Sequence, residues 1–193
     1  ADFRDGAKLV NLRNTVFVGA NDGMLHAFNA TDGVERFAYV PASVYEVPRS
    51  STTNATERKL RLMADPGYTH RFTVDGPPNI ADAYVNGRWR SLLVGSTGAG
   101  SRGLFVMDVS ETVVGTGGFG TGSLMWEFSE AQSTDMGHVL GYAHVVKLRD
   151  GRWAVIFGNG YDSATGQASL FVLDAATGAL IKQIKPSTQT GRK

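Results

Sequence analysis

The sequence predicts an all-β protein built from β-propeller blades, in which each blade is a four-stranded antiparallel sheet. One plan recurs in three segments, residues 15–33, 88–110 and 152–178: a β-rich run ends at a glycine, a polar loop follows, and a second apolar run ends at Asn or Asp. An Asn-Gly pair directly precedes the second segment and an Asp-Gly pair directly precedes the third, and both pairs favour tight hairpin turns. Glycine makes up 24 of 193 residues, well above its usual share of about 7%, as expected of a chain with many turns.

The first predicted blade covers about residues 6–45. Its two β-rich runs end at Gly19 and Asn29, and the polar residues between them predict a hairpin loop. The segment that would supply the opening strand of this blade is residues 6–12. An insertion at residues 46–71 separates it from the second blade.

The second blade, about residues 72–130, and the third, about residues 138–186, follow the full four-strand plan. Asn86-Gly87 and Asp150-Gly151 each join the first two strands, and both pairs predict type I′ turns with positive φ at the two central residues. The expected strands are 80–85, 89–94 and 124–128 in the second blade and 142–148, 153–157 and 179–184 in the third, in addition to the runs that end at Asp108 and Asp174.

About three blades make only a partial propeller, because closed propellers contain roughly four to eight. The spacing between equivalent residues of the last two blades exceeds that of compact repeats, and insertions such as the glycine-rich Gly115–Gly122 account for the excess. Open sheet edges are normally paired or covered. The remaining blades are therefore expected elsewhere in a longer protein or from a second copy of the chain.

Composition excludes several classes of partner and chemistry. Nineteen basic and eighteen acidic residues leave a formal charge of +1, so no bulk field favours nucleic acid or an anionic membrane. No apolar run approaches the roughly 18 residues of a membrane span. Cysteine is absent, which excludes disulfides and thiolate metal sites.

Four phrases of the sequence are distinctive: ANDGMLHAFNATDG, HRFTVDGPPNIADAYV, RSLLVGSTGAGSRGLFVMDV and AVIFGNGYDSATGQASLFVLDAATG. Together they resemble the PilY/PilC family of type IV pilus tip-associated proteins, and the match covers most of residues 15–184. The combination of the FGNGY loop with DGMLHAF is the specific part, since each phrase alone is shared with quinoprotein-like repeats.

The resemblance implies an exported module at the bacterial cell surface, outer membrane or pilus tip. It implies part of a C-terminal propeller that supports pilus extension, surface adhesion and twitching motility, with pilus or minor pilin proteins, host or abiotic surfaces and the remaining propeller blades as partners. It also implies calcium control through an aspartate-rich loop. No such run occurs before Lys193, so Ca²⁺ is expected to bind beyond this residue, and no cofactor is expected within the chain.

Two residues of the GNGYDS loop, Asn159 and Asp162, are weak candidates for metal ligands because their side chains offer oxygen atoms. A single carboxylate is poor for calcium, and the alternative is a long turn in which Gly158 and Gly160 take positive φ while Asp162 bonds nearby backbone. The four histidines lack metal-ligand spacing and are expected to bond to backbone groups.

The insertion carries the candidate partner-binding residues Arg58, Lys59 and Arg61, which can meet an acidic partner or simply form a solvated surface. A short helix is expected around them, near Glu57–Met63. The tryptophans of the strands, Trp89, Trp126 and Trp153, are expected in the core between blades, with a sugar-binding platform as the alternative for one of them.

The sequence predicts a binding or scaffolding module and no enzyme. It contains no Gly-x-Ser-x-Gly elbow and no carboxylate pair with readable acid and base roles. The alternative is a fragment of a PQQ-type quinoprotein dehydrogenase propeller, which the phrase Leu-Asp-Ala-Ala-Thr-Gly suggests. Repeats of that class usually carry tryptophan four residues after the glycine, where this chain has Phe37 and Lys182.

Overall fold

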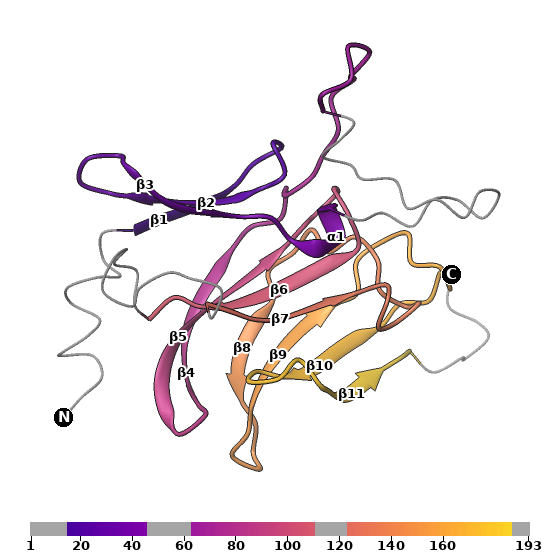
Figure 1. The fold of residues 1–193 in the computed structure, drawn as a ribbon. Helices are drawn as coiled ribbons and strands as arrows, with labels where there is room; N and C mark the ends of the chain where they lie inside the picture. Colours follow the sequence, from indigo (N-terminus) through magenta and orange to yellow (C-terminus); the bar gives the residue numbers. More distant parts are fainter. Residues whose placement is uncertain (1–14, 46–62, 111–122, 187–193) are drawn as a thin grey trace.

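The computed structural model describes residues 15–45, 63–110 and 123–186. Within these ranges the chain forms three antiparallel sheets that lie face to face as successive blades (Figure 1). Neighbours in sequence are neighbours in each sheet, so every blade is a simple meander. The predicted all-β propeller-blade fold is confirmed.

Blade 1 contains three described strands, and blades 2 and 3 contain four each. The strands of blade 1 are β1 (Thr15–Gly19), β2 (Leu25–Asn29) and β3 (Glu35–Tyr39), and the short helix α1 (Ala42–Tyr45) follows them. Blade 2 consists of β4 (Asn79–Val85), β5 (Arg88–Ser96), β6 (Gly103–Asp108) and β7 (Leu124–Ser129). Blade 3 consists of β8 (His144–Lys147), β9 (Trp153–Gly158), β10 (Leu170–Asp174) and β11 (Leu180–Ile184).

Several predictions fall on residues that the structure does not describe. They are the opening strand of blade 1 at residues 6–12, the glycine-rich Gly115–Gly122, and all of the helix expected near Glu57–Met63 except its last residue, which lies in a turn.

The two predicted type I′ turns have different outcomes. Asn86 and Gly87 have φ values of 52° and 75°, as that turn requires. In the β8–β9 turn only Gly151 has positive φ, at 90°, so the prediction for Asp150 is wrong. The reason is one extra loop residue: the N–H of Gly151 bonds the carbonyl of Leu148 at 3.0 Å, which gives a three-residue loop closed by a left-handed glycine.

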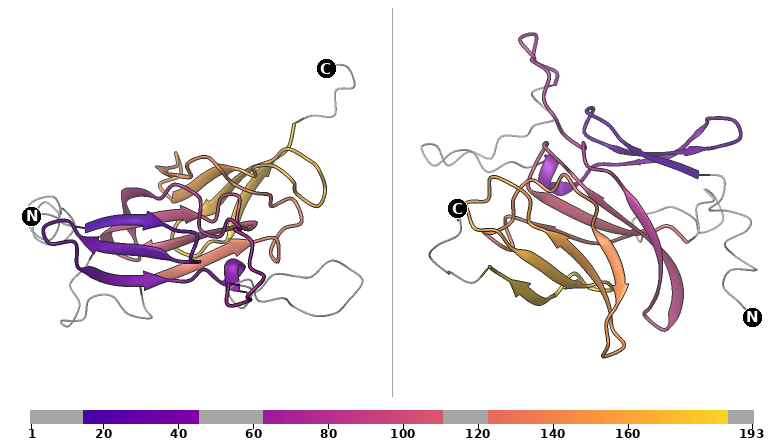
Figure 2. Two further views of the ribbon diagram at one scale, coloured as in Figure 1. Left: turned by 90° about the horizontal axis from the view of Figure 1, so that it is seen from above. Right: turned by 180° about the vertical axis from the view of Figure 1, so that it is seen from behind.

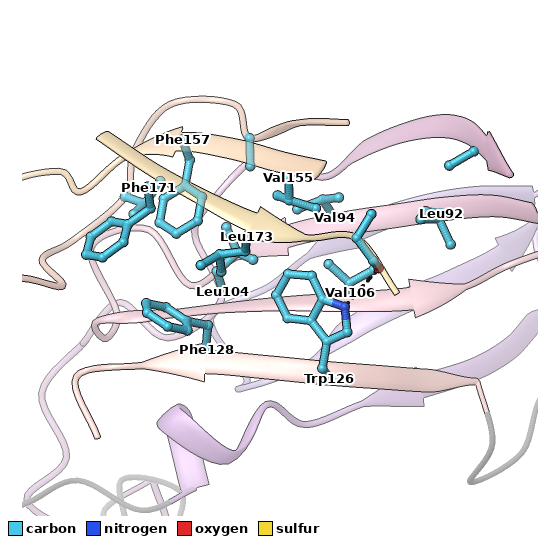
Figure 3. Packing of buried hydrophobic residues seen from close by; sticks show 14 of the residues in the cluster. Leu92, Val94, Leu104, Val106, Trp126, Phe128, Val155, Phe157, Phe171 and Leu173 are labelled. Carbon is cyan, nitrogen blue, oxygen red and sulfur yellow. Dashed lines mark hydrogen bonds between the residues drawn. The ribbon is translucent and has the colours of Figure 1, made fainter. Parts of the chain in front are cut away.

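Blade 2 is packed on both faces, which explains why its strands read as continuous apolar runs instead of alternating ones. In β6, Leu104 and Val106 face blade 3, while Phe105 and Met107 face blade 1. The larger core lies between blades 2 and 3 (Figure 3). Its labelled members come from both sheets: Leu92, Val94, Leu104, Val106, Trp126 and Phe128 from blade 2, and Val155, Phe157, Phe171 and Leu173 from blade 3.

Trp126 connects the two blades by more than packing. Its indole N–H donates to the carbonyl of Ala175 at 3.0 Å, so the one polar atom of this buried ring is satisfied across the interface. Trp126 therefore fulfils the expectation of a core position between blades.

The antiparallel strands divide the loops between two ends of the blades. We call the end with the β1–β2, β5–β6 and β9–β10 loops the loop end; the described parts of the connections between blades, residues 40–45, 63–78 and 130–143, also lie there. We call the opposite end, with the β4–β5 and β8–β9 turns, the turn end. These two turns form the lower tips of their sheets in Figure 1, and the view from behind in Figure 2 shows the same arrangement.

Candidate partner-binding face

The loop end is a continuous surface because each loop is bonded to the next. The connection before β4 reaches blade 1, where Thr73 Oγ1 donates to the carbonyl of Ala20 at 3.1 Å. It also packs on the β5–β6 loop, since a Cβ on Gly100 would lie 1.8 Å from the carbonyl oxygen of Thr73. The connection before β8 bonds both later blades: the N–H of His138 donates to the carbonyl of Tyr161 at 2.8 Å, and its Nδ1 lies 3.1 Å from the carbonyl oxygen of Gly98.

Large apolar and aromatic side chains are exposed at this end. Tyr161 is 50% exposed and Tyr142 is 59% exposed, and Leu140 and Phe72 are also exposed. The ring of Tyr161 stacks on His138 with centroids 5.0 Å apart, which holds its orientation. Rigidly held aromatic residues contribute contact area at a small entropic cost, and they are enriched in protein interfaces.

Arg102 links three segments of the loop end by charge. Its Nη1 donates to Glu130 at 2.7 Å and its Nη2 donates to Asp162 at 2.9 Å, so a blade 2 loop is tied to the following connection and to blade 3. Burial opposes the charge of Arg102, but the hydrogen bonds to the two carboxylates outweigh it and raise the pKa of the guanidinium.

The two candidate metal ligands have protein partners. Asn159 donates to the carbonyls of Asp135 at 2.7 Å and Gln167 at 2.8 Å, and its Oδ1 accepts the N–H of Ser169 at 2.9 Å. All polar groups of this buried side chain are therefore used in shaping the loop. Asp162 pairs with a guanidinium instead of the nearby backbone group that the sequence suggested.

The GNGYDS turn differs from the expected one in its backbone. Gly160 has positive φ, at 76°, but Gly158 does not; Asp162 takes the second left-handed position with φ 57°. Within the described ranges, no group of three or more His, Cys, Asp or Glu side chains is arranged to hold a metal ion.

Asp135, which the sequence did not single out, anchors the long β9–β10 loop. Its carboxylate accepts hydrogen bonds from Lys185 at 2.6 Å, Gln183 at 2.7 Å and the hydroxyl of Thr165. These bonds, that of Lys185 first, lower the pKa of Asp135 to about 2. Only contacts across blade 3 bring these residues together, so no local pattern could have indicated the cluster.

His26 in blade 1 bridges two carboxylates. Its Nδ1 lies 2.5 Å from Glu35 and its Nε2 lies 2.8 Å from Asp22. The bond to Glu35 is the main cause that raises the pKa of His26, although burial opposes it. The expected bonds from histidine to backbone are therefore found at His138, whereas His26 binds side chains.

Arg58, Lys59 and Arg61 lie outside the described residues, so the structure does not place them. Trp89 differs from the core position expected of it, since 44% of the side chain is exposed near the β4–β5 turn. None of the helices in residues 15–45, 63–110 and 123–186 is long and apolar enough to cross a membrane.

A family model, curated relatives and a solved structure point to one family. The family model described as the PilY1 beta-propeller domain matches residues 3–193. A type IV pilus biogenesis factor PilY1 homolog of Xylella fastidiosa is 45% identical over 170 residues, which are 88% of this chain and 10% of that protein. The type IV pilus biogenesis factor PilY1 of a Pseudomonas aeruginosa strain is 39% identical over 179 residues, covering 91% of this chain and 14% of that protein.

A solved structure has the same fold. The crystal structure of the Pseudomonas aeruginosa PilY1 C-terminal domain matches with a TM-score of 0.68 and 36% identity, over 92% of this chain and 31% of that one. The chain thus spans about a tenth to a seventh of the length of the two curated relatives, which are named as biogenesis factors of the pilus.

Proposed function

Since the chain belongs to the PilY1 β-propeller family, we propose that it is a non-enzymatic module of a type IV pilus biogenesis factor and that its loop end binds pilus or minor pilin proteins. The observation that supports this most directly is the exposed ring of Tyr161, which stacks on His138, on a surface cross-linked between blades where Tyr142 is also exposed. An interface of this kind needs a fixed shape and exposed aromatic anchors.

The module acts from outside the cell, at the bacterial surface or pilus tip, and supports pilus extension, attachment and twitching motility. Such a role requires a stable surface and no reacting groups. The names of the relatives favour it over a quinoprotein dehydrogenase, which would need a quinone site. If purified protein bound the quinone and reduced a dye with an alcohol, the non-enzymatic role would be wrong.

The loop-end surface is tested in the full-length protein, expressed in bacteria that lack their own copy. Tyr142→Ser combined with Tyr161→Ser should reduce the number of surface pili about tenfold and abolish twitching, because two exposed interface anchors are removed without changing the core. Val34→Ser is the matched control, since Val34 is 61% exposed but lies in the β2–β3 turn at the opposite end. Wild-type piliation of the double variant, at normal protein levels, would contradict the proposal.

Calcium control, in this proposal, belongs to residues beyond Lys193. The thermal midpoint of this chain should be the same with calcium and with a chelator, whereas a longer chain that includes the following blades should be stabilised by calcium. If calcium shifted the thermal midpoint of the shorter chain, a metal site would lie within that chain, and Asp162 would again be a candidate ligand.

A further inference from the structure

A second exposed aromatic cluster lies at the turn end, away from the surface proposed for pilus proteins. Tyr84 and Trp89 face each other across the β4–β5 hairpin with ring centroids 5.9 Å apart, and Trp89 meets Trp153 of blade 3 at 5.8 Å. Tyr84 is 50% exposed and Trp89 is 44% exposed, while Trp153 is half-buried behind them. The three rings form one edge-to-face row that spans two blades.

Hydrogen bonds and packing fix this row in place. The hydroxyl of Tyr84 donates to the carbonyl of Gly87 at 2.9 Å, within the tight Asn86-Gly87 turn. Trp153 packs against the core between blades 2 and 3. Trp89 is therefore presented on a rigid base, with little conformational freedom to lose when a ligand covers it.

The two hairpins that carry the row are rich in basic residues. The two hairpins, residues 79–96 and 144–158, contain five basic and two acidic residues, so their formal charge is +3, although the whole chain carries only +1. Lys147 lies directly opposite Trp153 in the strand ladder, and Arg88 precedes Trp89 in sequence. Arg88 is 58% exposed, and Lys147 and Arg149 are also exposed.

The nearby acidic groups do not cancel this charge where a ligand would bind. Asp150 is held by Arg152 through contacts of 2.9 Å and 2.6 Å, and Asp82 accepts a hydrogen bond from Ser91 at 2.8 Å. Asp108, at the C-terminal end of β6 on the side of the turn end, forms a close ion pair with Arg90 and a longer one, at 3.5 Å, with Arg88. Lys147 and Arg149 are exposed and can donate to an outside anion, and Arg88, 58% exposed and only loosely paired with Asp108, can add a further donor.

We propose that the turn end binds an anionic saccharide, such as a chain of uronic acids or a sulfated sugar. The C–H face of a pyranose ring is apolar and stacks on the electron-rich face of an exposed indole or phenol. Its carboxylate or sulfate accepts charge-assisted hydrogen bonds from arginine and lysine. Tyr84 and Trp89 supply the stacking surface, and Arg88, Lys147 and Arg149 supply the charge.

The size of the patch favours a saccharide over nucleic acid. Single-stranded nucleic acid is held by a basic groove that follows many phosphates, whereas this charge is confined to two neighbouring hairpins. The site does not depend on the proposed binding of pilus proteins, because the two surfaces lie at opposite ends of the strands.

The test is calorimetric titration of the chain with a short oligogalacturonate, a neutral glucose oligomer of the same length and an oligothymidylate. The oligogalacturonate should bind, the neutral oligomer should bind at least about tenfold more weakly, and added salt should weaken binding. Trp89→Ala should lower the affinity about tenfold or more. Arg88→Gln should also lower it, and this second variant covers the case in which Trp89→Ala unfolds the tip.

Tyr142→Ala at the loop end is the matched control, with an equally exposed aromatic ring, and should bind like the wild type. The proposal is overturned if the oligogalacturonate does not bind, if the neutral oligomer binds equally well, or if the oligothymidylate binds more tightly. The proposal would also be overturned if Arg88→Gln and a correctly folded Trp89→Ala both bound the oligogalacturonate with wild-type affinity. Loss of piliation in the loop-end variants has no bearing on this result.

Discussion

Replacing Asp135 with Asn should destabilise the protein by about 2 to 4 kcal/mol at neutral pH. The magnitude follows from its three hydrogen bonds, because a bond to a charged group contributes roughly 1.5 to 3 kcal/mol. Lys185 is half-exposed and can return to water, so its share is small. Gln183 lies in β11 and Thr165 in the β9–β10 loop, and an amide at position 135 would turn a donor toward the donors of Gln183.

The loss should depend on pH in a defined direction. The pKa of Asp135 is lowered from 3.8 to about 2 in the folded protein, so the folded state favours the ionised carboxylate. Its stabilising effect is fully present above about pH 4 and is lost as the pH falls through the folded value. Urea denaturation at several pH values should therefore show a constant gap between wild type and Asp135→Asn from pH 7 to 5, which narrows toward pH 2.5.

Asp150→Asn is the control for this experiment. Asp150 also pairs with a cation, through Arg152 at 2.9 and 2.6 Å, and its pKa is also lowered, but both side chains are about half exposed. Exposed ion pairs contribute little to stability, so this variant should unfold like the wild type. Equal losses in the two variants, or a gap for Asp135→Asn that persists at pH 2.5, would refute the reasoning.

Three further predictions concern the blades themselves and are tested by urea denaturation. Gly178→Ala should destabilise the protein more than Gly33→Ala. Both glycines have positive φ, 73° and 74°, but only at position 178 would a Cβ meet a ring, that of Trp126, at 2.7 Å. Equal losses of stability in the two variants would argue against this contact. Phe171→Ala should cost about 3 to 5 kcal/mol, since Phe171 is fully buried, and a loss below about 1 kcal/mol would mean that the blade interface is loose. His26→Gln should be less stable than wild type at pH 6, and the gap should shrink as the pH rises through the raised pKa of His26, because the imidazolium form is the one stabilised; a gap that widens above pH 7 would contradict this sign.

Local sequence patterns predicted most of the blade framework. The strand ends at Gly19, Asn29 and Asp174 were correct because a β-rich run followed by a turn residue is a short-range signal. The Asn86-Gly87 turn was correct for the same reason. The turn at Asp150 was wrong because its type depends on how many residues the flanking strands leave unpaired, which the dipeptide alone does not specify.

Contacts between distant residues were beyond such patterns. Arg102 and Asp162 meet only because the loops of adjacent blades converge, and Asp135 meets Lys185 only after blade 3 has folded. The sequence pointed to the GNGYDS loop through its oxygen-bearing residues, but the exposed aromatic side chain of Tyr161 is the feature that can meet a partner. All three tryptophans were predicted to lie in the core. Trp89 is exposed because it lies near the tip of the β4–β5 hairpin, and the sequence alone does not show how far that hairpin extends.

The alternating contacts of β6 have a consequence for how this sequence can diverge. Phe105 is constrained by the shape of blade 1, whereas its neighbours Leu104 and Val106 are constrained by blade 3. A change of side-chain volume at one of these positions calls for a compensating change in one adjoining blade and leaves the other unaffected. Consecutive positions of this strand are thus under separate selection. Substitutions on one face of blade 2 can be compensated by blade 1, and substitutions on the other face by blade 3.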